Sequence, residues 1–287
     1  MKLIAFLPAL FLSVLSAQAT NKDSTGNVGD NLDLQGVLDL FKNSSDIESF
    51  EKAINSESNH VNNLDLNKDG ETDYIKVVDH ADSNAHALVL QVPVTETESQ
   101  DVAVIEIEKN GEESATIQIE GDDDVYGDNY LVEPYENYVG KDEYDEKAAV
   151  KTKVVVNVWA WPAVRFVYGP RYRVWVSPWG WRRYPVWWKP WRPVAWRVHW
   201  GRVARYHHHY RVVHVHRVHV AHRIYHRHRV HSAVYHHNHP HMRNSAAHPR
   251  SNNQPKSKIK NQPKNQPRNQ SRGGKPKGGN RGGGRKR

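Results

Sequence analysis

The acidic residues of this chain all lie in its first half. There are 32 Asp and Glu residues, and the last is Glu146, whereas 31 of the 40 Lys and Arg residues follow position 150. Residues 20–150 therefore carry a formal charge of −24, and residues 151–287 carry +31 with no acid to offset it. The second part also contains all ten Trp and 16 of the 19 His. Asymmetry of this size indicates either a polyanionic partner or pairing of the two parts with each other.

The first residues have the pattern of an export signal. A positive Lys2 precedes an apolar run at residues 3–15, and Ala17-Gln18-Ala19 is a small-residue cleavage site, so residues 1–19 are a predicted signal peptide. The apolar run is too short to span a bilayer, and later apolar stretches carry Arg, so no integral membrane span is expected. The absence of Cys excludes disulfides and thiolate zinc sites. We expect an exported protein that is periplasmic, cell-surface or secreted.

Residues 20–137 are predicted to form a small acidic domain. Apolar residues at helical spacing predict one short helix around residues 34–41 and another that follows a capping box at Ser45-Asp46-Ile47-Glu48. After residue 73 the period changes to two, which predicts strands at 74–78, 85–94, 102–108 and 115–120. The predicted fold class is α+β, with two short helices on one face of a small antiparallel sheet.

Turn residues define the connections of this sheet. Residues 79–84 are predicted to link the first two strands, and Asn110-Gly111 is the strongest short-range signal for a hairpin turn. This hairpin is expected to place Ile105 and Ile107 opposite Ile117 and Ile119 on a buried side. Gly121-Asp122-Asp123-Asp124 is expected to be a solvated turn rather than a second ion site. His60, His80 and His86 have no predicted partner, so a structural or surface role is expected.

Between the predicted helices and strands, residues 65–73 carry oxygen-bearing side chains at alternate positions. Calcium takes six to eight oxygen ligands, and Gly70 permits the sharp turn that wraps them round one ion. The alternative is an Asx-rich turn without an ion. We favour calcium because four oxygen side chains at this spacing repel one another in the absence of a cation. The predicted ligand side chains are those of Asp65, Asn67, Asp69 and Asp73.

Residues 65–73 resemble the Asp-x-[Asp/Asn]-x-Asp-Gly-x-x-Asp calcium loops of dockerins, thrombospondin type 3 repeats and FG-GAP propellers. The strand that follows them is most similar to the FG-GAP version. The resemblance implies calcium coordination, with the backbone carbonyl of Glu71 as a further ligand, but no particular fold or partner. Lys76 occupies the position where an EF-hand carries a bidentate Glu, so the loop is not an EF-hand. The whole chain resembles uncharacterised exported bacterial proteins with a small acidic domain and a Trp/His-rich basic tail, a likeness that implies no activity.

The basic half begins after a polar predicted linker at residues 138–150. Residues 151–200 are rich in Trp, Arg and Pro and are predicted to be partly β, with a strand at 154–161 and a hairpin formed by 165–168 and 172–176. Four prolines predict extended chain from 177 to 200. The Trp residues either cover an irregular core or form an interfacial surface for anionic lipid. The composition resembles that of cationic Trp/Pro-rich antimicrobial peptides.

Residues 201–250 form a His-rich basic segment. Its mixed spacings specify no closed tetrahedral site, although His222 and His226 at i, i+4 suit a helix. A flexible chain with several imidazoles binds zinc, copper or nickel; the alternative is that these residues act only as titratable bases. Residues 251–287 consist of Asn, Gln, Pro and Lys repeats followed by Gly-rich basic sequence, and they are predicted to be disordered.

No enzyme is predicted, because the chain lacks a Cys nucleophile, a phosphate loop and the Gly-x-Ser-x-Gly and His-Glu-x-x-His motifs. The favoured hypothesis is an exported binding protein in which a calcium-stabilised acidic domain carries a cationic aromatic arm. The arm is expected to contact anionic lipid, lipopolysaccharide, acidic polysaccharide or extracellular DNA. The alternative is a His-rich protein that binds or buffers zinc, copper or nickel. A third hypothesis is self-association of neighbouring copies through their opposite charges.

Overall fold

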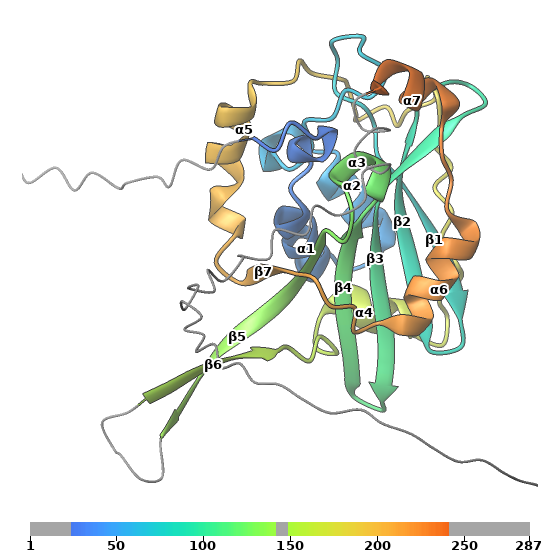
Figure 1. Cartoon of the computed structure of the whole chain (residues 1–287). Coiled ribbons are helices and arrows are strands. Elements are labelled where there is room, and N and C mark those ends of the chain that lie inside the picture. The colour runs from blue at the N-terminus through green and yellow to red at the C-terminus, as the bar shows by residue number, and fades with distance from the viewer. Residues whose placement is uncertain (1–23, 142–148, 241–287) are drawn as a thin grey trace, which may run out of the picture. The chain divides into compact units, whose positions relative to one another are not determined.

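The computed structural model describes residues 24–141 and 149–240, which form an α+β structure around one antiparallel sheet (Figure 1). The sheet has seven strands in the order β1-β2-β3-β4-β5-β6, and β7 pairs with β5. The predicted fold class is therefore confirmed, although the sheet is larger than expected. Within the described residues, no helix has the length and apolar character needed to cross a membrane. The predicted tail at 251–287 and the signal peptide lie outside the described residues.

Two helices precede the sheet, as the sequence predicts. They are α1, Leu34–Asn43, and α2, Ile47–Ile54, flanked by the 3-10 turns η1, Val28–Asn31, and η2, Glu57–Asn59. Asp33 caps α1 by accepting a hydrogen bond from the Gly36 backbone N–H. The capping box of α2 lies one residue later than predicted, because Asp46 is the N-cap and exchanges hydrogen bonds with Ser49. Phe41 and Phe50 meet edge to face between the two helices at a centroid distance of 5.2 Å.

The first four strands are present, and three of them are longer than predicted, whereas β2 ends one residue earlier. They are β1, Lys76–Asp82; β2, Ala85–Pro93; β3, Ser99–Gly111; and β4, Ser114–Gly121. Ile105 pairs with Ile119 and Ile107 with Ile117, which confirms the predicted register.

Both predicted hairpins of this sheet are present, but their turns are shorter or lie slightly later than predicted. Asn110-Gly111 lies within β3 at a register shift, where the Asn110 amide donates to the Thr116 hydroxyl, and the turn falls at residues 112–113. The turn predicted at 79–84 shortens to residues 83–84, because Ser83 adopts a left-handed conformation with φ of 44°. A tight turn of this kind lets β1 continue to Asp82.

The chain then passes through α3, Asp123–Tyr126, to the long hairpin of β5, Leu131–Lys141, and β6, Ala149–Val155. The ends of the predicted linker at 138–150 therefore belong to paired strands, and residues 142–148 lie outside the described residues. The hairpin predicted at 165–176 is wrong. Residues 162–167 form α4, Pro162–Val167, because Pro162 is preorganised for the first position of a helix.

The His-rich segment contributes ordered elements. The extended chain predicted from 177 is interrupted by turns at residues 181–182 and 186–187, and Arg182 has a positive φ of 54°. The elements that follow are α5, Trp196–Val203, the 3-10 turn η3, Ala204–Tyr206, and β7, Tyr210–Val213. They are followed by α6, His219–His228, and α7, Ala233–Asn238. The helix favoured by the spacing of His222 and His226 is thus present.

Both faces of the sheet are covered. The large core on one face includes residues of α1, α2 and α4, whereas α6 lies against β1, β2 and β3 on the other (Figure 1). Ile224 and Tyr225 of α6 pack there with Ala87, Val89 and Val104. All nine residues of β2 are buried for this reason. The basic half therefore supplies the second layer of a fold that the acidic half begins.

The Trp-rich segment is partly packed into the protein. Trp161 and Trp188 are buried, and Trp188 meets Tyr74 edge to face at a centroid distance of 5.2 Å. The buried Glu51 of α2 holds this segment, accepting hydrogen bonds from the Ser177 hydroxyl at 2.7 Å and the Trp175 indole N–H at 3.2 Å. Trp187, in contrast, is 43% exposed. The Trp side chains thus serve both as core and as surface.

Candidate metal centre

Buried charge pairs join the acidic and basic halves. Glu133 accepts hydrogen bonds from Arg211 at 2.7 Å and Arg217 at 2.8 Å, and its side chain is fully buried. Asp122 pairs with Arg229 at 2.6 Å. Asp122 is only 1% exposed and caps α3, so the expectation of a solvated turn at 121–124 was wrong. Pairing of the two parts within one chain therefore accounts for some of the charge asymmetry.

Four side chains from both halves converge on the sheet face beneath α6. Glu106 lies on β3 and Glu120 on β4, His222 lies on α6, and His216 lies between β7 and α6. Glu106 is opposite Gln118, two residues before Glu120. Because side chains two residues apart share a sheet face, both carboxylates point toward α6. We call these four residues the Glu/His cluster.

The spacing within the cluster suits a metal ion. The His222 Nδ1 atom lies 2.9 Å from Glu120 Oε2 and 3.2 Å from Glu106 Oε1. The His216 Nε2 atom lies 3.7 Å from Glu120 Oε1, and its Nδ1 atom lies 3.9 Å from Glu106 Oε2. Zinc ligands about 2.1 Å from a tetrahedral ion stand roughly 3.4 Å from one another. One ligand atom from each residue lies within 4.8 Å of the others, so the set needs little movement to enclose an ion.

Two atoms of the cluster are buried without a hydrogen-bond partner, Glu106 Oε2 and His216 Nδ1. Their separation of 3.9 Å is too long for a hydrogen bond between them. A buried carboxylate oxygen without a donor is costly, and such atoms call for an explanation such as an ion. A cation between Glu106 and His216 would satisfy both.

The pKa values of the four side chains indicate which of them carry a proton that a metal ion would have to displace. Burial raises the pKa of Glu106, and the charge of Glu120 adds to that effect. Hydrogen bonds to Glu106 and Glu120 raise the pKa of His222 to about 10, so its imidazole is protonated at neutral pH. Burial lowers the pKa of His216, which keeps that imidazole neutral and able to coordinate. For Glu120, burial acts upward but is outweighed by the hydrogen bond and charge of His222, and its pKa is lowered.

Sequence reasoning found only part of this cluster. The helical spacing pointed to His222, but its partner in that pair, His226, lies outside the four, although its ring is 4.2 Å from that of His222. Glu106 and Glu120 were missed because acids that alternate with Ile predict a solvated sheet face. The sequence did contain one signal for them: in the predicted hairpin, Glu106 and Glu120 are diagonal neighbours on the same face of two paired strands.

A second group consists of Asp124, His231 and His236. The Asp124 Oδ2 atom lies 2.6 Å from His231 Nδ1 and 3.6 Å from His236 Nε2. The Arg229 guanidinium also lies 3.2 Å from that oxygen. Because this fixed positive charge opposes a cation, the group is a poorer metal site than the Glu/His cluster.

The predicted calcium loop adopts a tight turn built on its own side chains. Asp65 accepts hydrogen bonds from the Asp69 and Gly70 backbone N–H groups, and Asp69 accepts one from Glu71. The Asn67 amide donates to Asp69 Oδ2 at 2.9 Å. Asp65, Asn67 and Asp69 thus lie together, as both the calcium interpretation and the Asx-turn interpretation require. Calcium binding by this loop stays a prediction.

The predicted ligand Asp73 is mostly buried, and one of its oxygens accepts from the Leu66 N–H at 2.5 Å. The basic half contacts the same loop, because the Trp191 carbonyl accepts from the Thr72 N–H at 2.7 Å and His239 Nε2 lies 3.1 Å from the Leu66 carbonyl oxygen.

Two of the three histidines of the acidic half, His80 and His86, have partners that the sequence did not reveal. His86 is buried with its Nδ1 atom 2.8 Å from Asp79 Oδ2. His80 stacks on His228 of α6 at a centroid distance of 4.2 Å. Both contacts link residues that a sequence pattern does not relate, and both are structural.

Comparison with known proteins found no matching family model, no matching curated protein and no matching solved structure. Function is therefore argued from the geometry of the described residues.

The first prediction concerns the loop at 65–73. Calcium should bind with a dissociation constant on the order of 0.1–1 mM, as in extracellular modules. Burial raises the pKa of Asp73 to about 8, so this carboxyl holds a proton at neutral pH that calcium must displace. Binding should therefore release protons and tighten as the pH rises toward that value. Calorimetry in buffers with different ionisation heats measures both effects.

Asp69→Ala should abolish this binding, because it removes a ligand side chain. Glu71→Ala is the matched control and should bind normally, since only the backbone carbonyl of residue 71 is expected to coordinate. No heat at millimolar calcium, together with an unchanged melting curve, would show that the segment is an Asx turn without an ion.

Proposed function

We propose that the protein is a non-enzymatic exported protein that binds a divalent transition metal at the Glu/His cluster. The observation that carries this proposal is the buried pair of atoms without hydrogen bonds, Glu106 Oε2 and His216 Nδ1, next to two further ligands at metal-site spacing. This proposal develops the transition-metal hypothesis of the sequence and gives it a defined site.

The donor set favours zinc among the metals expected from the sequence. Imidazole nitrogen suits zinc, copper and nickel, and zinc also accepts carboxylate oxygen at about 2.0–2.2 Å. Four protein ligands fill a tetrahedral ion, as in structural zinc sites, whereas catalytic zinc sites usually keep one position open for water. The cluster therefore supports binding rather than hydrolysis. An ion bound here would also link α6 and the loop before it, which belong to the basic half, to β3 and β4 of the acidic half.

The second prediction is that the mature protein binds one zinc ion at the Glu/His cluster more tightly than it binds zinc at its other His residues. Binding should release at least one proton, because His222 is protonated at neutral pH in the absence of metal. Zinc affinity should accordingly rise with pH. Calorimetric titration across a pH series, together with the melting temperature at one equivalent of zinc, checks this outcome.

Variants assign the tight site to the cluster. Glu106→Gln keeps the size of the side chain but removes its charge, and it should weaken the tight site by more than roughly tenfold, as should His216→Gln. His237→Gln is the matched control, since His237 is exposed on α7 and lies outside the cluster. The proposal is wrong if all three variants retain the same tight zinc binding.

A second candidate function is contact with an anionic envelope surface, and an exposed groove favours it. The groove has a volume of about 360 Å³ and is lined in part by Trp187, Trp188, Trp191, Lys52 and Lys189. The Lys52 ammonium lies 5.4 Å from the Trp187 ring. Trp side chains next to Lys suit the headgroup region of anionic lipid, or the acidic groups of lipopolysaccharide, polysaccharide or DNA. In this proposal the loop at 65–73 carries the calcium that stabilises the protein.

The third prediction is that the protein binds vesicles containing anionic lipid, and that salt weakens this binding because it screens the charges. Acid should strengthen the binding by charging His residues, which is the opposite of the trend expected for zinc. Fluorescence should shift to the blue on anionic vesicles, and Trp187→Leu should reduce that shift. Neutral vesicles are the control. Vesicle binding at neutral pH that does not weaken as salt is added would contradict the proposed contact with an anionic surface.

A further inference from the structure

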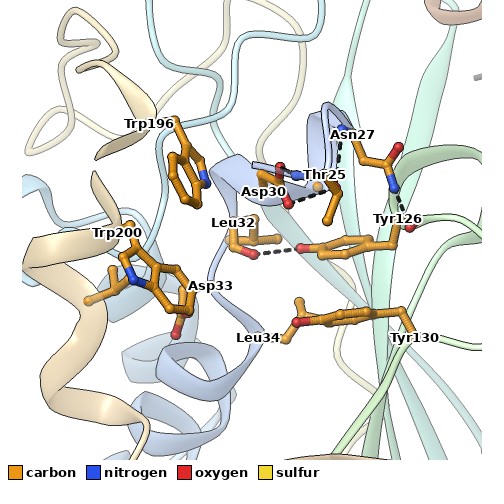
Figure 2. Close-up of a pocket in the computed structure, with 12 residues that line it drawn as sticks. Thr25, Asn27, Asp30, Leu32, Asp33, Leu34, Tyr126, Tyr130, Trp196 and Trp200 are labelled. Atoms are coloured by element: carbon orange, nitrogen blue, oxygen red, sulfur yellow. Dashed lines mark hydrogen bonds between the residues drawn. The ribbon is translucent and has the colours of Figure 1, made fainter. Parts of the chain in front are cut away.

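The Trp residues of the basic half differ in what covers their rings. Trp196 and Trp200 of α5 stack on each other beside η1, with centroids 5.9 Å apart (Figure 2). The Trp200 ring also meets that of His207 at a centroid distance of 4.6 Å. These two Trp side chains therefore serve packing within the protein.

Trp187 and Trp191 instead line the groove next to α2, which has a volume of about 360 Å³. Trp187 meets the Tyr74 ring at 6.4 Å with a tilt of 52°, and Trp191 meets the Trp188 ring edge-on at 6.3 Å. Neither contact is a face-to-face stack, and Trp187 is 43% exposed. The groove therefore offers ring surface to a ligand, and its volume lies in the range of small-ligand sites, roughly 300–1,000 Å³.

Contacts with the acidic half fix the shape of this groove. Trp188, the most buried of its three Trp residues, is 6% exposed and meets the Tyr74 ring at 5.2 Å. The Trp191 carbonyl accepts a hydrogen bond from the Thr72 N–H at 2.7 Å. The two Trp residues are thus held in place before a ligand arrives.

Two Lys side chains give the groove a positive charge. Lys52 lies on α2 with its Nζ atom 5.4 Å from the centre of the Trp187 ring, and Lys189 lies between Trp188 and Trp191 in the sequence. In the part of the chain that the structure describes, neither ammonium forms an ion pair with a carboxylate. Of the described residues that line the groove, only Glu57 is acidic, so two Lys and one Glu give a net charge of +1.

The groove also contains a polar group without a partner. The Trp188 indole N–H is buried, and no hydrogen-bond acceptor for it lies among the described residues. A buried donor without an acceptor is costly, and it calls for an explanation. Because Trp188 belongs to the lining of the groove, this donor points to a ligand that carries acceptor oxygens.

We propose that the groove binds a uronic acid residue of an acidic polysaccharide; the proposal rests on the second candidate function, contact with an anionic envelope surface. A pyranose ring has an apolar face of C–H groups, which suits the exposed Trp187 ring. Its carboxylate suits the ammonium groups of Lys52 and Lys189. Its oxygen atoms supply an acceptor for the Trp188 indole, and its hydroxyl groups donate to Glu57.

A bilayer fits the groove less well than a sugar does. Trp side chains that anchor a protein at the headgroup region must reach out from its surface. Trp188 is buried, and the backbone of Trp191 is tied to the acidic half, so these rings face a hollow instead. A lone phosphate would pair with the Lys residues but leave the Trp rings uncovered.

The test is titration of the mature full-length protein with digalacturonate, followed by NMR of the sugar. The expected dissociation constant is on the order of 1 mM, in keeping with a small and polar ligand. Galabiose, the neutral disaccharide with the same linkage, should bind at least roughly tenfold more weakly, because it lacks the carboxylates that pair with Lys. Equal binding of the two disaccharides would overturn the proposal.

Variants place the binding in the groove. Trp187→Leu and Lys52→Gln change exposed side chains, and each should weaken digalacturonate binding by roughly fivefold or more. Lys109→Gln is the matched control and should bind normally, because the Lys109 ammonium lies 4.7 Å from the Trp159 ring in a similar pair outside the groove. Circular dichroism confirms that each variant is folded. Folded Trp187→Leu and Lys52→Gln proteins that bind digalacturonate normally would overturn the proposal.

Vesicles of anionic lipid separate this inference from the function on which it rests. If vesicles bind through Trp187 and digalacturonate does not bind, the groove is a lipid site; the inference is then wrong, and the second candidate function stands. If neither digalacturonate nor anionic vesicles bind, both are wrong. Binding of digalacturonate that Trp187→Leu and Lys52→Gln weaken supports both.

Discussion

An ionised carboxylate is costly to bury unless a counter-charge or several hydrogen-bond donors are buried with it, and in this protein the distant half of the chain supplies the counter-charges. The side chains of Glu133 and Asp122 have no exposed surface, and both belong to the acidic half. Their partners, Arg211 and Arg229, come from the basic half. The acidic half therefore contains charges that it does not neutralise by itself, and the basic half covers them. Two segments of opposite composition form one fold because each completes the interior of the other.

The candidate sites also lie where the acidic half and the basic half are in contact. The Glu/His cluster takes its carboxylates from the sheet and its imidazoles from the segment that covers it. The loop at 65–73 belongs to the acidic half and is contacted by Trp191 and His239 of the basic half. A ligand bound at either place would contact residues that the two halves bring together, so it would stabilise the folded protein.

The sequence predicts the parts of this structure that depend on neighbouring residues. Helices α1 and α2 and the pairing of Ile105 with Ile119 follow from local periodicity. It does not predict which faces are buried by distant segments. Glu106 lies between two buried Ile residues and has the pattern of a solvated position, yet His222, 116 residues further on, covers it. The exact turn residues were not predicted either: Asn110 lies in β3, where its amide donates to the Thr116 hydroxyl, and the turn follows at residues 112–113.

The most direct test of the account is a double-mutant cycle on Asp122 and Arg229, which join the two halves. The free energy of unfolding would be measured for the unaltered protein, Asp122→Asn, Arg229→Gln and the double variant, at several protein concentrations. The account predicts a coupling energy of roughly 1–3 kcal/mol that does not depend on concentration, because the two residues contact each other within one chain. Additive effects of the two substitutions would contradict it, and so would a coupling that grows with protein concentration.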